Sequence, residues 1–210
     1  MFTGLVTAVA TVASATPLGP DPTHGKRVAL AVDPQWMQGV QPGDSIAVNG
    51  ACMTVVAVRA GGFDVDVSAE SLARTSGMDR PGAEVNLEQS LTLQTRLGGH
   101  LVTGHVDGVG RVAAFAPVGE SWLLQIDVPA GLARFFAYKG SIVVNGVSLT
   151  VNAVDDRADG SRVSINLIPH TLQHTNLHAL RPGDGVNLEI DLIARYVERM
   201  LQSEAPTPSD

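Results

Sequence analysis

Apolar and polar residues alternate along short runs through most of the chain. Gly, Pro, Asn and Asp interrupt these runs at short intervals. Alternation places the apolar side chains on one face of a strand, and frequent turn residues keep the strands short. The pattern therefore predicts a small antiparallel sandwich or barrel. The clearest alternating apolar positions are Ile46, Val48, Val55, Ala57, Phe63, Val65, Val67, Ile142, Val144, Val163, Ile165 and Leu167.

Two Asn-Gly pairs, Asn49-Gly50 and Asn145-Gly146, lie between alternating runs. Both residues tolerate a positive φ, so each pair predicts a tight hairpin turn. The Pro-Gly pairs at residues 42–43, 81–82 and 182–183 predict further turns.

Three segments of the first half recur in the second half, in the same order and at an offset of about a hundred residues. This period exceeds the roughly 20–50 residues of solenoid repeats, and each copy is long enough to bury its own core. We therefore expect two similar domains, residues 1–99 and 100–190. The matching segments are residues 2–6 with 102–106, 45–55 with 141–151, and 80–88 with 181–189.

Residues 191–202 break the alternation and are expected to form a helix with a narrow apolar stripe. Such a helix can pack back on a barrel or pair with copies of itself. Shorter helices are expected near residues 70–78 and 170–178, and the tail 203–210 is predicted to be disordered. The stripe consists of Leu192, Ile193, Tyr196, Val197, Met200 and Leu201, with Arg195, Glu198 and Arg199 opposite.

Composition excludes several classes of protein. The net charge is −7, no run of Lys or Arg occurs, and only 4% of the residues are aromatic, which argues against a nucleic-acid-binding surface. A single cysteine, Cys52, excludes an internal disulfide and favours a reducing compartment, so a cytoplasmic location is expected. We see no signal peptide and no apolar stretch of the roughly 18 residues that a membrane span needs.

The histidines do not predict a metal site. His100 and His105 are an odd number of residues apart, so on a strand they point to opposite faces, and no third ligand accompanies them. His105 aligns with Leu5, so the fold does not require a histidine there. It is either a polar side chain at a barrel rim or a general acid or base. His170, His174 and His178 align with Glu70, Arg74 and Met78, and we expect them on a solvated helix face.

Cys52 and Ser148 occupy equivalent positions after the two Asn-Gly pairs. Each precedes a threonine, Thr54 or Thr150. A small residue that merely packs well is one interpretation, but the paired threonines favour a polar pocket. Asp191, which aligns with Ser90, is either the N-cap of the last helix or a carboxylate of the site.

Five segments together resemble the riboflavin synthase alpha chain family, and the resemblance runs from Met1 to about Leu201. They are residues 1–6 (Met-Phe-Thr-Gly-Leu-Val), the doubled Val-Asn-Gly-x-x-x-Thr-Val motif, residues 98–108 (Gly-Gly-His-Leu-Val-Thr-Gly-His-Val-Asp-Gly), residues 138–142 (Tyr-Lys-Gly-Ser-Ile) and residues 167–172 (Leu-Ile-Pro-His-Thr-Leu).

The resemblance implies an all-β fold of two tandem six-stranded Greek-key barrels with a C-terminal helix that holds a homotrimer together. It implies that two 6,7-dimethyl-8-ribityllumazine molecules react by transfer of a four-carbon unit to give riboflavin and 5-amino-6-(D-ribitylamino)uracil. No cofactor and no metal takes part. An association with lumazine synthase is a further implication.

The resemblance also implies two pockets, but it does not assign the roles of the reacting groups in them, which are our hypothesis. His105 is the first choice for proton transfer, Ser148 with Thr150 would act in the C-terminal barrel and Cys52 in the N-terminal barrel, and Asp191 is a further catalytic candidate. Lys139 would reach the site from an adjacent subunit. The N-terminal pocket would be lined by Phe2, Thr3, Gly4, Leu5, Val6, Cys52, Met53, Thr54, Asp66, Val67, Ser68, Ala69, Glu70 and Ser71. The C-terminal pocket would be lined by Gly104, His105, Val106, Ser148, Leu149, Thr150, Ile168, Pro169, His170, Thr171, Leu172 and Gln173.

A non-catalytic lumazine- or flavin-binding protein of the same fold, such as the antenna proteins of luminous bacteria, is the main alternative. Those proteins resemble the enzyme but lose polar groups in one pocket, whereas here both pockets keep theirs. One departure from the family pattern is residues 75–77, Thr-Ser-Gly, where many members have Thr-Asn-Leu; residues 175–177 keep Thr-Asn-Leu.

Overall fold

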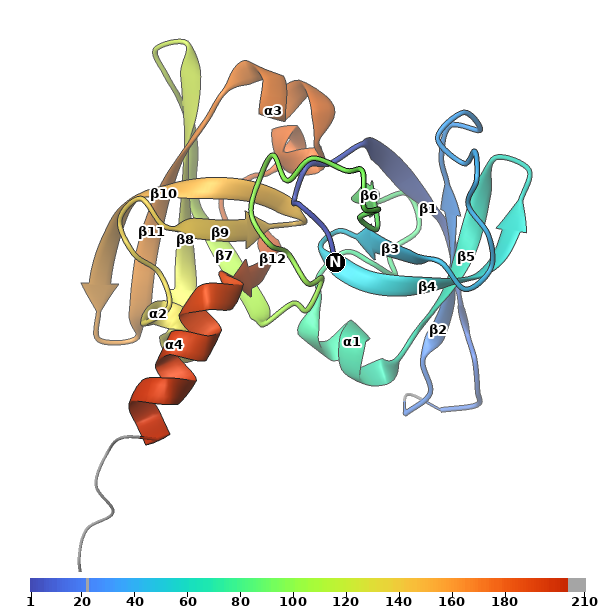
Figure 1. Ribbon diagram of the computed structural model, residues 1–210, viewed down its shortest axis with the longest axis horizontal. Coiled ribbons are helices and arrows are strands. Elements are labelled where there is room, and N and C mark those ends of the chain that lie inside the picture. The colour runs from blue at the N-terminus through green and yellow to red at the C-terminus, as the bar shows by residue number, and fades with distance from the viewer. Residues whose placement is uncertain (22, 204–210) are drawn as a thin grey trace, which may run out of the picture.

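The computed structural model describes residues 1–21 and 23–203 and shows two closed six-stranded barrels followed by a helix (Figure 1). All neighbouring strands are antiparallel. In each barrel the strands follow the order first, second, fifth, fourth, third, sixth around the barrel, which is a Greek-key arrangement. The expected fold class is confirmed. Within the described residues, no helix is both long and apolar enough to cross a membrane.

The strands of the N-terminal barrel are β1 (Ala8–Pro17), β2 (Lys26–Ala31), β3 (Ser45–Val48), β4 (Ala51–Arg59), β5 (Gly62–Val67) and β6 (Glu84–Gln89). Those of the C-terminal barrel are β7 (Gly108–Val118), β8 (Ser121–Pro129), β9 (Ser141–Val144), β10 (Val147–Arg157), β11 (Gly160–Leu167) and β12 (Gly185–Ile190). The helices are α1 (Ala69–Arg74), α2 (Ala130–Ala133), α3 (Pro169–His174), the 3₁₀ helix η1 (Asn176–Ala179) and α4 (Leu192–Ser203).

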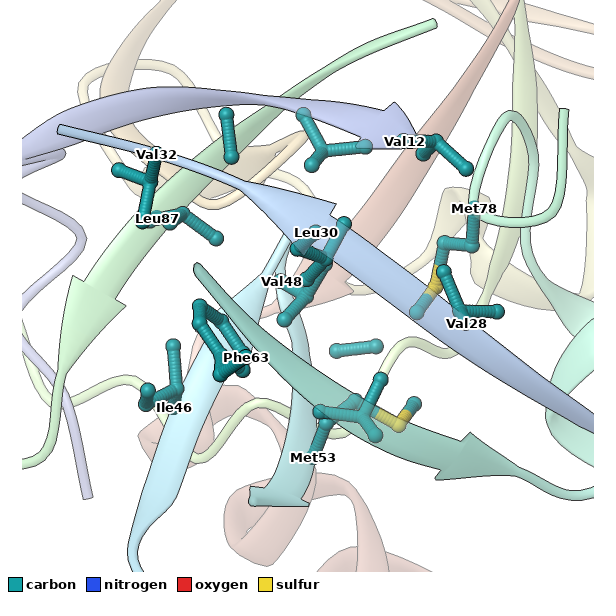
Figure 2. Packing of buried hydrophobic residues seen from close by; sticks show 14 of the residues in the cluster. Val12, Val28, Leu30, Val32, Ile46, Val48, Met53, Phe63, Met78 and Leu87 are labelled. Atoms are coloured by element: carbon teal, nitrogen blue, oxygen red, sulfur yellow. The ribbon is translucent and has the colours of Figure 1, made fainter. Parts of the chain in front are cut away.

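Each barrel is filled by the alternating apolar positions of its strands. Figure 2 shows side chains such as Val28, Leu30 and Phe63 meeting inside the N-terminal barrel, with Met78 entering from the turn after α1. The first and fourth strands of both barrels carry a shift in register at equivalent places, as between Val12 and Ser14. Such bulges bend a strand and help a small sheet to close on itself.

The two barrels meet at their Asn-Gly turns. Asn49 and Asn145 both have a φ of 48°, and each is followed by a glycine with positive φ, so the predicted hairpin turns are confirmed. A Cβ on Gly50 would lie 2.8 Å from the backbone nitrogen of Gly146, and one on Gly146 would lie 2.9 Å from that of Gly50. Only glycine allows the two turns to approach so closely.

Buried asparagines join the barrels around these turns. Asn86 Nδ2 donates to the carbonyl of Asn145 at 2.8 Å, and Asn187 Nδ2 donates to that of Asn49 at 2.9 Å. Asn176 adds a bond from its Nδ2 to Asn49 Oδ1 at 2.9 Å, which Ser76 at the equivalent position does not reproduce. The departure at residues 75–77 therefore lies at this interface between the barrels.

Two segments outside the strands cross between the barrels. We call residues 1–6 the N-terminal strap and residues 100–106 the linker strap. They pair antiparallel at Phe2 and Val102, whose backbone groups exchange hydrogen bonds of 2.8 and 3.1 Å. The side chains of Phe2 and Val102 are buried in a small core between the barrels. Val6 packs on the core of the C-terminal barrel, and Val106 packs on the core of the N-terminal barrel.

The helices differ slightly from the expected ranges. α1 and α3 end four residues earlier than predicted, and η1 continues the second of them after a break at Thr175. α4 extends away from the barrels (Figure 1), and its contacts with them include ion pairs from Arg195 to Asp107 and from Glu198 to Arg134. Its apolar stripe is exposed from Ile193 to Leu201 and only Leu192 is half-buried, so the alternative in which this stripe packs back on a barrel is wrong. Ser203 is the last helical residue, and the predicted disorder of residues 204–210 lies outside the described residues.

Candidate functional site

A pocket of about 210 Å³ lies where the start of β4 meets the end of α1 and the linker strap. We call it the Cys52 pocket. The backbone nitrogen of Cys52 donates to the carbonyl of Gly104 at 2.7 Å, which fixes the strap against β4. The strap approaches so closely that a Cβ on Gly104 would lie 2.7 Å from the Cβ of Cys52. The lining residues are Ala51, Cys52, Met53, Glu70, Ser71, Arg74, Thr75, Gly104, His105 and Val106.

The equivalent place in the other barrel, which we call the Ser148 site, is built from the start of β10, α3 and the N-terminal strap. The backbone nitrogen of Ser148 donates to the carbonyl of Gly4 at 2.8 Å. A Cβ on Gly4 would lie 2.6 Å from the Cβ of Ser148. Gly4 and Gly104 have φ values of 75° and 78°, so the two straps turn in the same way at the two sites.

The structure corrects the grouping expected from the sequence. Gly4, Leu5 and Val6 were expected beside Cys52, and Gly104, His105 and Val106 beside Ser148. Each strap instead crosses to the other barrel, so His105 lies with Cys52 and the N-terminal strap lies with Ser148. The expected pairing of His105 with Ser148 in one pocket is therefore wrong within a single chain. The physical reason is that each strap is fixed by contacts with the opposite barrel: Gly104 accepts from Cys52, Gly4 accepts from Ser148, and Val106 and Val6 pack on the opposite cores.

His100, which the sequence presented only as an unsupported metal ligand, is a residue of the Ser148 site. Its Nδ1 lies 2.7 Å from Ser148 Oγ, a hydrogen-bond distance in which either group can donate, depending on the tautomer. Burial lowers the pKa of His100, and the negative charge of Asp191 acts in the opposite direction. The ring is therefore neutral at neutral pH and can accept the proton of the serine hydroxyl. Nothing in the sequence pairs His100 with Ser148, because 48 residues separate them and the contact forms only in the folded chain.

The sequence left open whether Asp191 is the N-cap of the last helix or a carboxylate of the site. Its Oδ1 accepts from the backbone nitrogen of Ile193 at 2.9 Å, so it caps α4. Its charge also acts on His100, which links the start of α4 to the group that contacts Ser148.

The other expected site residues fall into several environments. Of the expected segment 66–71, which spans the end of β5 and the start of α1, Glu70 and Ser71 line the Cys52 pocket. Asp66 instead pairs with Arg27 through two bonds of 2.7 and 2.8 Å, which holds the pKa of that carboxyl below its usual value. Val67 is buried in the barrel, and Ser68 caps α1.

Several side chains expected to touch a ligand lie elsewhere or at the surface. Phe2 and Thr3 are buried between the barrels and support the N-terminal strap rather than lining a cavity. His170 and His174 stack on each other with ring centroids 4.1 Å apart on the exposed face of α3. Among the described residues, no three His, Cys, Asp or Glu side chains gather in a way that could hold a metal ion. Exposed side chains also include Thr54, Thr150, Ile168, Pro169, Gln173 and Lys139.

Comparisons with known proteins agree with the doubled fold. The model of the lumazine binding domain matches twice, at residues 3–90 and 103–191. Riboflavin synthase of Photobacterium phosphoreum is 39% identical over 207 residues, covering 98% of this chain and 91% of the relative. The enzyme of Mycobacterium tuberculosis is 49% identical over 165 residues, covering 77% of this chain and 81% of the relative.

A solved structure, LumP complexed with riboflavin, superimposes with a TM-score of 0.79 at 26% identity, covering 90% of this chain and 99% of that one. LumP complexed with 6,7-dimethyl-8-(1'-D-ribityl) lumazine has a TM-score of 0.77 at 24% identity and supports the fold alone. With a family model over both halves and relatives matched along most of its length, the chain belongs to the riboflavin synthase family, with one lumazine binding domain in each half.

Proposed function

We propose that this chain catalyses the reaction of two 6,7-dimethyl-8-ribityllumazine molecules to give riboflavin and 5-amino-6-(D-ribitylamino)uracil. The observation that carries the proposal is the pair of equivalent sites with different reactive groups. One site holds Cys52 and His105, and the other holds Ser148 and His100. A reaction between two copies of one molecule needs two sites of similar shape, and its two substrates need different chemical treatment.

The two sites suggest a division of roles. The C7 methyl group of one lumazine must lose a proton, and His105 in the Cys52 pocket is placed to take it, because imidazole exchanges protons readily near neutral pH. The other lumazine must become electrophilic. Ser148, whose hydroxyl contacts the neutral ring of His100, is placed to orient or activate that molecule. The two products together contain the atoms of the two substrates, so no co-reactant is needed.

Binding both substrates in a fixed pose also removes much of the entropic cost of a bimolecular step. We propose that the facing sites come from neighbouring chains. The Cys52 pocket, at about 210 Å³, is smaller than the roughly 300–1,000 Å³ of a complete ligand site. This is expected if a neighbouring chain supplies part of its lining. The exposed stripe of α4 would hold the chains together as a homotrimer, and Lys139 would reach a neighbouring site. An association with lumazine synthase stays a prediction of the resemblance, and a cytoplasmic location stays a prediction from the single cysteine.

Lumazine binding without catalysis is the second candidate, because LumP has the same fold and binds riboflavin. The retention of Cys52, His105, Ser148 and His100 at the two sites favours the enzyme. Purified protein is expected to convert 6,7-dimethyl-8-ribityllumazine, with no other addition, into riboflavin and the pyrimidine product in equal amounts. Absorbance and product chromatography measure both. Binding with a change in lumazine fluorescence but no riboflavin would identify a binding protein and contradict the proposal.

A further inference from the structure

Two buried carboxylates, Glu88 at the end of β6 and Glu189 at the end of β12, are not explained by the proposed reaction. Their neighbours Leu87 and Leu188 point into the barrels, so by alternation the two glutamates point out, towards the space between the barrels. Both are nonetheless buried, with exposed fractions of 7% and 2%. A carboxylate is seldom buried unless it is well hydrogen-bonded.

Each carboxylate accepts three hydrogen bonds from one strap. Glu88 accepts from the backbone nitrogen and Oγ1 of Thr3, both at 2.6 Å, and from the backbone nitrogen of Gly4 at 2.9 Å. Glu189 accepts from the same two groups of Thr103, both at 2.7 Å, and from the backbone nitrogen of Gly104 at 3.0 Å. A carboxylate can accept all three bonds, whereas a glutamine has only one acceptor oxygen.

The far side of each strap contacts the opposite barrel. Gly4, held by Glu88 of the N-terminal barrel, accepts from Ser148 of the C-terminal barrel. Gly104, held by Glu189 of the C-terminal barrel, accepts from Cys52 of the N-terminal barrel. Each glutamate therefore holds two strap residues, and the second of them is bonded to the backbone of Ser148 or Cys52 in the other barrel.

We propose that Glu88 and Glu189 are positioning residues that act across the barrels: Glu88 fixes the strap at the Ser148 site, and Glu189 fixes the strap at the Cys52 pocket. The importance of this for catalysis rests on the proposed function, but the positioning itself does not.

Burial raises the pKa of both carboxyl groups, while the three bonds on each act in the opposite direction. The folded state therefore binds these protons more tightly than the unfolded state, and the stability from these two groups falls as the pH rises through their raised pKa values. The fold nonetheless keeps both glutamates buried and fully hydrogen-bonded to the straps, which fits a positioning role.

Cys52 is the single thiol of the chain and reports on its own pocket. Its rate of alkylation by iodoacetamide is expected to rise about tenfold in Glu189→Gln, since a buried donor loses its acceptor, and to stay within about twofold of wild type in Glu88→Gln. A second reporter, the double variant Cys52→Ser/Ser148→Cys, moves the thiol to the other site. There the order is expected to reverse, with the larger rise in alkylation rate in Glu88→Gln. A smaller rise is expected in Glu189→Gln, because His100 of the linker strap also contacts residue 148.

The control is Glu84→Gln, which changes an exposed glutamate on the same strand as Glu88. It should leave the alkylation rates of both thiols unchanged. Should a glutamine variant fail to fold, Thr3→Val and Thr103→Val each remove one donor and are expected to give the same crossed pattern more weakly. A general loss of stability would raise the alkylation rate equally at positions 52 and 148. An effect confined to one barrel would raise the alkylation rate of the thiol in the same barrel as the changed glutamate. Either result would overturn the proposal. The alkylation rates do not depend on turnover, so failure of the proposed function would leave this test intact.

Discussion

Replacing His105 with alanine is expected to slow riboflavin formation by at least about a hundredfold, because proton transfer by a positioned side chain contributes about 10²–10⁴-fold to a rate. His105 is exposed at the Cys52 pocket, and no described residue is hydrogen-bonded to its ring. Its loss therefore leaves no buried partner unsatisfied, and the folded structure should persist. The measurement is kcat at saturating lumazine, with a thermal unfolding curve recorded on the same sample.

The matched control is His24→Ala. His24 lies in the turn between β1 and β2, where it contacts Asp21 on the surface. This variant is expected to turn over at the wild-type rate. If His105→Ala kept most of the wild-type kcat, the proton would have to be taken by another group, and His100 beside Ser148 would be the next candidate.

Placing charges on the apolar stripe of α4 is expected to separate the chains and abolish activity together. Ile193 and Leu201 have 67% and 61% of their surface exposed in the single chain, which is unusual for large apolar residues that lie on one helix face. In the double variant Ile193→Glu/Leu201→Glu, burial of two carboxylates would oppose association. Sedimentation velocity should show a monomer, and turnover should fall by at least about a hundredfold, since each site would lose its second substrate.

The control for this variant is Gln202→Glu on the opposite face of α4, where Gln202 contacts Glu198. It is expected to keep both the assembled mass and the turnover. A monomeric Ile193→Glu/Leu201→Glu variant with wild-type turnover would show that one chain holds a complete active site, and our view of neighbouring chains would then be wrong.

The barrels could be predicted from the sequence because their determinants are local. Alternation set which face of each strand points inward, as at Phe63, Val65 and Val67, and the Asn-Gly pairs set two hairpins. The doubled motifs then required the same fold twice. The helical spacing of residues 191–202 similarly predicted the apolar stripe of α4, while its exposure is seen only in the structure.

The crossing of the straps could not be predicted from the repeat. Exchanging residues 2–6 with residues 102–106 between the barrels preserves the internal symmetry, so aligning the two copies cannot distinguish the two arrangements. The long-range pairing of Phe2 with Val102 decides between them. Glu88 and Glu189 did carry a signal. The two copies keep a glutamate at aligned positions directly after Leu87 and Leu188, and this identity between the copies favours a shared structural role.

In the proposed assembly each active site joins the Cys52 pocket of one chain to the Ser148 site of its neighbour, and mixed assemblies test this arrangement. Chains carrying His105→Ala and chains carrying Ser148→Ala would be co-expressed with different affinity tags, and assemblies that contain both would be isolated. In such a cyclic trimer one site of the three is intact, so turnover should recover to about a third of the wild-type value. Mixed assemblies as inactive as the two parent variants would mean that both substrates react within one chain and would contradict the arrangement.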